Sequence, residues 1–192
     1  MEMLRIPLIS VGALDGTLAE DARGPAGKSD FFRLQAHAPT AYAAYRPFAK
    51  AIFAALELNE IDRELVVLLT AELEKGAYEW AQHEKIAAAL GATRAQIDAI
   101  ALRDIAAEVF SARQQALLAF ARQVVEEVRV SDAVFAAVAG HYSHREIVET
   151  LYTIGNYMML ARISEVARLP LDDLNGLDVL REAQKEAAAA RA

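Results

Sequence analysis

Two side chains that can exchange protons stand four residues apart in the stretch from Glu74 to His83. In a helix, Glu79 and His83 would lie one turn apart on the same face, so a carboxylate would sit beside an imidazole. This pair is the minimum for general acid–base chemistry, and a second acid, Glu64, lies in the segment just before it. The same spacing also fits a plain surface pair that stabilises a helix by ~0.2–0.5 kcal/mol.

Glu64, Glu79 and His83 are the predicted catalytic residues. Gly76 breaks the apolar pattern between them, so the two flanking helices can fold back and bring Glu64 near His83. A carboxylate bonded to one imidazole nitrogen fixes the tautomer and leaves the other nitrogen for a substrate proton. We therefore expect Glu64 or Glu79 to orient the ring and His83 to act as the acid or base. In the first turn of its helix, Glu79 should also ionise more easily than other buried acids.

Six further side chains are candidates for contact with a substrate. Tyr78 can donate a hydrogen bond, and Trp80, the only tryptophan, can form an apolar wall. Arg145 and Arg162 can hold a carboxylate, although each also fits an ordinary surface ion pair. A satisfied hydrogen bond in the core is the alternative for Asn156. The full set is Tyr78, Trp80, His144, Arg145, Asn156 and Arg162.

The histidines raise the question of a metal. His141 and His144 bracket Ser143, but two histidines three residues apart need a third ligand before they form a metal site. A site made of His83, Glu79 and one of these two stays open as an alternative, while our prediction is no metal. No glycine-rich phosphate loop follows a strand, so we expect no nucleotide and no other cofactor.

The central stretch resembles the signature of the carboxymuconolactone decarboxylase and alkylhydroperoxidase-D-like superfamily. In the thiol-dependent branch of that superfamily, a glutamate precedes a Cys-x-x-Cys-x-x-x-His motif, which falls here on Glu64, Gly76, Glu79 and His83. Both cysteine positions are replaced, whereas the glutamate and the histidine match. The form Tyr-Glu-Trp-x-x-His resembles the cysteine-free branch. The likeness spans about residues 30–170 and includes residues 34–39, 62–65 and 143–147.

This resemblance implies an all-α, multi-helix domain that assembles as a homo-oligomer, either a trimer or a hexamer. It also implies loss of CO2 from a small carboxylated lactone of aromatic breakdown, or a related proton transfer. The conjugated lactone can hold the charge left when CO2 departs, so no cofactor is needed. The protein would hold the carboxylate through an arginine and deliver a proton to carbon from His83.

Two alternatives to a decarboxylase remain open. One is the peroxidase label of the hydroperoxide-reducing branch, whose thiol chemistry a chain without cysteine cannot perform. The other is a non-catalytic binding or assembly protein that keeps the helical scaffold. The burial of Glu64, Glu79 and His83 distinguishes this second alternative from an enzyme. If all three side chains face open solvent with no cavity nearby, a non-catalytic protein is favoured.

Composition limits the partners. The 192 residues fit one domain, and a hydrophobic content of 55% suggests that apolar surface is buried between subunits. A net charge of -7 disfavours nucleic acids and anionic membranes. No apolar run approaches the ~18 residues that span a bilayer. The start lacks the pattern of a signal peptide, so we expect a cytoplasmic protein that acts on a small molecule.

The elements that must position these residues are predicted to be helices throughout, since no segment alternates like a strand. Residues 1–38, which include the run Gly24–Gly27, are predicted to form an arm or loop, either disordered or packed on the domain or a neighbouring subunit. Residues 39–192 are predicted to form one helical domain. We expect helices to start at or near Thr40, Asn59, Ala77, Thr93, Ser111, Ser131, Ser143 and Leu177. The polar residues of this set, which are the threonines, the serines and Asn59, are expected to cap these helices with their side chains.

Overall fold

The structure, a computed structural model, describes residues 3–172 and 176–191 and contains only helices within them. The predicted all-α fold is therefore confirmed. Two short 3-10 helices, η1 (Val11–Ala13) and η2 (Ala26–Lys28), lie near the N-terminus. The α-helices are α1 (Gly16–Asp21), α2 (Asp30–Gln35), α3 (Pro39–Ala54), α4 (Glu60–Glu74), α5 (Ala77–Leu90), α6 (Arg94–Ala101), α7 (Ala112–Glu127), α8 (Asp132–Ala139), α9 (His144–Ala167) and α10 (Gly176–Arg191).

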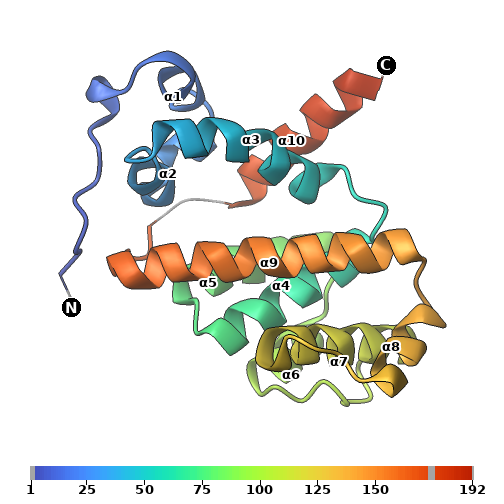
Figure 1. Ribbon diagram of the computed structural model, residues 1–192. Helices are drawn as coiled ribbons and strands as arrows, with labels where there is room; N and C mark the ends of the chain where they lie inside the picture. The colour runs from blue at the N-terminus through green and yellow to red at the C-terminus, as the bar shows by residue number, and fades with distance from the viewer. Residues whose placement is uncertain (1–2, 173–175, 192) are drawn as a thin grey trace.

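Helix α4 is the centre of the molecule. It packs against α5, α7 and α9, and every residue from position 62 to position 71 is buried. In Figure 1, the long helix α9 crosses the molecule, with α6, α7 and α8 on one side and α1, α2, α3 and α10 on the other. None of the described helices is both long enough and apolar enough to cross a membrane.

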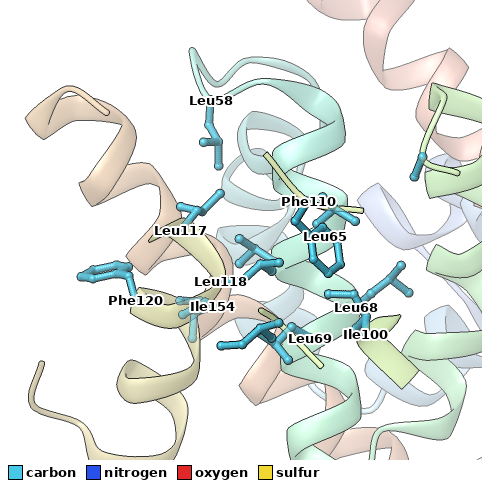
Figure 2. Packing of buried hydrophobic residues seen from close by; sticks show 14 of the residues in the cluster. Leu58, Leu65, Leu68, Leu69, Ile100, Phe110, Leu117, Leu118, Phe120 and Ile154 are labelled. Carbon is cyan, nitrogen blue, oxygen red and sulfur yellow. The ribbon is translucent and has the colours of Figure 1, made fainter. Parts of the chain in front are cut away.

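The main core joins the central helix to its neighbours on the α6–α8 side. Figure 2 shows leucines of α4 and α7 meeting Ile100 of α6 and Ile154 of α9. Fully burying a side chain of this size stabilises the fold by about 1.5–3 kcal/mol. This packing makes α4 a rigid support for the polar residues that it also carries. The labelled residues are Leu58, Leu65, Leu68, Leu69, Ile100, Phe110, Leu117, Leu118, Phe120 and Ile154.

Most predicted helix starts are confirmed, because short polar side chains accept hydrogen bonds from the first free backbone N–H groups. Thr93, Ser111 and Ser143 each form a full capping box, and the side chains of Asn59 and Ser131 cap α4 and α8. Helix α3 is the exception. It begins at Pro39 rather than Thr40, since proline is well suited to the first helical position. Pro47 lies inside α3, which continues past it to Ala54.

The segment predicted to be an arm or loop contains helices α1 and α2. Both are six residues long, too short to show a helical period in the sequence. Leu18, Phe32 and Ala36 form a small buried cluster, and the ring of Phe32 meets that of Tyr42 edge to face at 5.4 Å. The described part of this segment therefore packs on α3.

Candidate acid–base site

The break between α4 and α5 brings Glu64 and His83 together. Lys75 adopts a left-handed conformation at φ 60°, Gly76 begins α5, and the two helices pack side by side. As a result, Nδ1 of His83 lies 2.6 Å from Oε2 of Glu64. Glu64 is 0% exposed and His83 is 6% exposed, so this is a buried contact rather than a surface pair.

Gly76 is needed because of close packing rather than backbone strain. A Cβ at this position would lie 2.8 Å from the Cβ of Ala161 and 2.8 Å from Oε2 of Glu79. Real Cβ atoms do not approach other atoms that closely, so any larger residue would push α5 away from α9. Glycine at this position therefore keeps the start of α5 near α9.

Arg63 completes the pairing of Glu64. Nε of Arg63 donates to Oε1 of Glu64 at 3.0 Å, and Nη1 donates to the carbonyl oxygen of Phe53 at 2.7 Å. Nη2 lies 2.9 Å from the same Oε1 but is not aligned for a hydrogen bond. Burial by itself raises the pKa of Glu64, yet the attraction of His83 and Arg63 outweighs burial and lowers the pKa below its usual value. Glu64 is thus a buried anion between two partners.

The ring of His83 is held on both sides by aromatic residues. It meets Tyr157 edge to face at 4.7 Å and Phe53 at 6.0 Å. His83 also lines a cavity between α3, α5, α9 and α10. With Nδ1 bound to Glu64, Nε2 has no hydrogen-bond partner among the described residues. This nitrogen is free to bind a ligand.

Glu79 lies one turn before His83 but has a different partner. The hydroxyl of Ser164 donates to Oε2 of Glu79 at 2.9 Å, and Glu79 is 3% exposed. Burial raises the pKa of Glu79, and the hydrogen bonds to its own backbone N–H and to Ser164 only partly offset this effect. The expected ease of ionisation at a helix N-terminus is therefore overcome by burial. Of the two acids, only Glu64 contacts the imidazole.

Replacing Glu79 by glutamine should remove a pH-dependent loss of stability. Because the folded pKa of Glu79 is raised, its contribution is fully present below its usual pKa of 4.5 and is lost as pH rises through the folded pKa. We expect the free energy of unfolding of Glu79→Gln, relative to the parent, to increase between pH 5 and pH 8 in urea titrations. A constant difference across this range would contradict the prediction, and Glu126→Gln, at an exposed position on α7, is the control.

The cavity has a volume of about 410 Å³, which suits a small organic molecule. Helices α3, α5, α9 and α10 form its walls, with α1 and the segment around α2 at one end. His83 lies beside Ile86, Tyr157 and Leu160 on this lining. The site is therefore a partly open cavity in which an imidazole lies among mainly apolar and aromatic side chains.

Two of the predicted substrate-contact residues line this cavity. Asn156 accepts a hydrogen bond from the hydroxyl of Tyr45 at 2.9 Å, and burial raises the pKa of Tyr45 to about 12. Tyr78 donates to Asp172 at 2.8 Å, and burial together with that carboxylate raises its pKa well above the usual value. Both tyrosines therefore keep their protons at neutral pH.

The other four predicted contact residues lie elsewhere. Trp80 is half-buried against the main core, and His144 is exposed at the start of α9. Arg145 is paired with Glu57 and Glu149, while Arg162 is paired with Glu74, all outside the cavity. His141 is exposed as well, and no three metal-binding side chains are grouped anywhere in the described part of the chain.

Residues of α3 and α10 that line the cavity are missing from the sequence prediction. Tyr45 and Phe53 belong to the apolar pattern of α3 and look like ordinary core residues. Arg46 stands within the same pattern, and a cation inside an apolar helix face was the available signal. Glu186 lies on the last helix, where an alanine- and charge-rich sequence gives no sign of a binding wall.

The comparisons with known proteins agree with this geometry. The profile of the carboxymuconolactone decarboxylase family matches residues 39–123, a range that contains both Glu64 and His83. An alkylhydroperoxidase AhpD core protein from Ralstonia eutropha, an uncharacterised peroxidase-related protein, has the same fold: the TM-score is 0.79 at 20% identity, over 92% of this chain and 96% of the other. Residues 39–123 therefore match the carboxymuconolactone decarboxylase family, and the chain shares its fold with an AhpD-like protein.

Two further solved structures share this fold. A protein of unknown function from Agrobacterium tumefaciens, named as an AhpD antioxidant-defence candidate, aligns with a TM-score of 0.66 at 20% identity over 72% of this chain and 94% of its own. An uncharacterised peroxidase-related protein from a Silicibacter species aligns with a TM-score of 0.66 at 16% identity, over 75% of this chain and 77% of its own. No curated protein is significantly similar in sequence.

Proposed function

We propose that this protein is an acid–base enzyme in which His83, oriented by Glu64, transfers a proton to or from a small organic molecule in the cavity. The observation that carries the proposal is the 2.6 Å contact between Nδ1 of His83 and Oε2 of Glu64 beside that cavity. Both residues are almost fully buried, which is the condition that argues against a non-catalytic scaffold.

The partners of His83 suit it to proton transfer in both directions. The lowered pKa of Glu64 keeps an anion on Nδ1, and this anion stabilises the imidazolium that forms when Nε2 takes a proton. The same contact fixes the tautomer, so the neutral ring presents an unprotonated Nε2 to the cavity. Phe53 and Tyr157 hold the ring in place and limit the access of water.

Decarboxylation of a carboxylated lactone is the specific form of this chemistry that the family match favours. In that reaction the C–C bond to the carboxylate breaks, CO2 leaves, the lactone holds the electron pair, and His83 delivers a proton to carbon. The cations available to a substrate carboxylate are Arg46 and Lys50, which line the cavity. They take the place of Arg145 and Arg162, which lie outside it.

The test is to supply a carboxymuconolactone and follow CO2 release, and to incubate unsubstituted lactones in D2O and follow deuterium uptake at carbon by NMR. CO2 release would establish the decarboxylase, whereas uptake without CO2 release would establish proton transfer alone. If neither reaction exceeds the blank over a panel of lactones and related carbon acids, the proposed function is wrong. A thiol-dependent peroxidase assay should show no activity, because the chain contains no cysteine.

We infer in addition that the protein forms a trimer or a hexamer through an exposed face of α9. This α9 face runs along one side of the helix, which lies uncovered at the front of Figure 1. It continues onto α3, where the ring of Phe48 meets that of Tyr152 at 5.8 Å. Exposed apolar area of this kind is typical of subunit contacts. The α9 face consists of Val148, Leu151, Tyr152, Met159 and Val166.

Substituting Leu151→Glu should therefore reduce the molar mass in solution to that of a smaller assembly. A buried charge without a partner opposes association. Light scattering after size-exclusion chromatography gives the mass. Leu102→Glu changes an exposed leucine outside the α9 face and should leave the mass unchanged. A monomeric parent protein would contradict the inference, as would an unchanged mass in Leu151→Glu.

A further inference from the structure

The charged side chains that line the cavity are mostly acidic. Four carboxylates face two side chains with a positive charge, and a fifth acid, Glu79, has a pKa that burial raises. A cleft with apolar walls focuses the field of the charges around it, so a ligand that enters meets a negative potential. The four carboxylates belong to Glu20, Asp21, Glu182 and Glu186, and the cations to Arg46 and Lys50.

Both cations are already engaged by carboxylates of other helices. Nη2 of Arg46, on α3, lies 2.6 Å from Oδ1 of Asp21 on α1. Lys50 is paired with Glu186 of α10. A ligand carboxylate that took either cation would leave Asp21 or Glu186 unpaired beside it. Binding an anion would therefore exchange one ion pair for another and add a repulsion between like charges.

Most tyrosine hydroxyl groups on this lining already donate to protein oxygens and are not available as donors to a ligand. An anion needs N–H or O–H donors to replace its water, whereas a cation or an amide N–H needs acceptors. Three of the four tyrosines that line the cavity already donate their hydroxyl protons to protein oxygens. These bonds run from Tyr42 to Asp21 (3.0 Å), from Tyr45 to Asn156 (2.9 Å) and from Tyr78 to Asp172 (2.8 Å).

Aromatic rings make up much of the remaining wall. The negative face of such a ring attracts a cation, and its flat surface stacks on planar molecules. Two rings, those of Phe31 and Tyr78, are themselves stacked at 5.5 Å. The rings on the cavity lining are those of Phe31, Phe32, Tyr42, Tyr45, Phe53, Tyr78 and Tyr157.

We propose that the cavity selects a flat organic ligand without negative charge and prefers a cationic ligand over a neutral one of the same shape. This inference rests on the proposed function, because it places the substrate at His83. The side chain of His83 is more than nine-tenths buried and lines the cavity, and its Nε2 has no described partner. Among the reactions considered above, the inference favours proton transfer on an uncharged or cationic molecule over decarboxylation.

Three probes of one shape and different charge test the proposal: benzamidinium, benzamide and benzoate. Isothermal titration calorimetry on the full chain should give the tightest binding for benzamidinium, intermediate binding for benzamide, and binding at least ~10-fold weaker for benzoate, the scale of a modest like-charge penalty. Ala49→Trp fills the cavity and should abolish binding of benzamidinium. Benzoate binding as tight as benzamidinium, no binding of any probe, or benzamidinium binding that survives in Ala49→Trp would overturn the proposal.

A charge variant sharpens the test. The double variant Asp21→Asn/Glu186→Gln frees Arg46 and Lys50 and should tighten benzoate binding about tenfold while weakening that of benzamidinium. The matched control, Glu57→Gln/Glu74→Gln, changes the net charge equally but removes one carboxylate partner each from Arg145 and Arg162, which lie outside the cavity. The control should leave the order of the probes unchanged. Equal effects of the two double variants would show that only net charge matters and would overturn the proposal.

Binding and turnover separate this inference from the proposed function. If the order of the probes holds but His83→Gln leaves turnover unchanged, the acid–base function fails and the ligand class stands. If His83→Gln abolishes turnover but benzoate binds best, the function stands and the ligand class fails.

Discussion

Replacing His83 by glutamine should lower turnover by ~100-fold or more, the usual effect of losing a general acid or base. Glutamine fits a helix, has a similar size, and can still donate a hydrogen bond to Glu64, so the fold should persist. What it cannot do is exchange a proton near neutral pH. The measurement is kcat for the reaction identified in the CO2 or deuterium assay, with circular dichroism to verify the helix content.

The control for this experiment is another histidine. His144 is exposed at the start of α9 and does not line the cavity, so His144→Gln should keep full activity. A loss of activity in both variants would point to a general effect of histidine removal. Unchanged turnover in His83→Gln would exclude His83 from the chemistry.

The fold could be predicted from the sequence because its signals are local. Side-chain caps such as those at Asn59 and Ser143 act within three residues, and Gly91 ends α5 with a left-handed φ of 108°. The pairing of Glu64 with His83 is the one contact between helices that the sequence predicted. This contact was predictable because only a short break at Gly76 separates the two helices. Helices joined in this way pack against each other, so residues on their facing sides come together.

The rest of the site depends on helices far apart in the sequence. Tyr45 of α3 and Asn156 of α9 meet because these two helices pack against each other, and no local sequence pattern predicts that contact. Arg145 and Arg162 lie on the same long helix as Asn156, but a helix presents different sides to different neighbours. The sequence does not show which side of α9 faces the cavity, so it could not distinguish the cavity-facing positions of α9 from the exposed ones.

Replacing Glu64 by glutamine should cost about 3–5 kcal/mol of the free energy of unfolding, the range for breaking a buried ion pair. Arg63 would remain buried with a positive charge that faces a neutral amide and the carbonyl oxygen of Phe53, with no anion to balance it. Adding Arg63→Met should recover part of the loss, because it removes the unpaired charge. The control is Glu72→Gln, whose partly exposed pair with Arg103 should contribute about 0.2–1 kcal/mol. Urea denaturation at pH 7 gives these energies, and equal losses in Glu64→Gln and Glu72→Gln would contradict the prediction.

The acid limb of the stability profile gives an independent readout of the same residue. Because the folded pKa of Glu64 lies below its usual 4.5, its stabilisation is present at neutral pH and is lost as pH falls through the folded pKa. Glu64→Gln should therefore lose less stability than the parent between pH 5 and pH 3, the opposite side of the profile from Glu79→Gln. It should also lower turnover, since His83 would lose the anion that stabilises its protonated form. A variant that keeps full activity but shows the flattened acid limb would mean that Glu64 stabilises the fold without serving the chemistry.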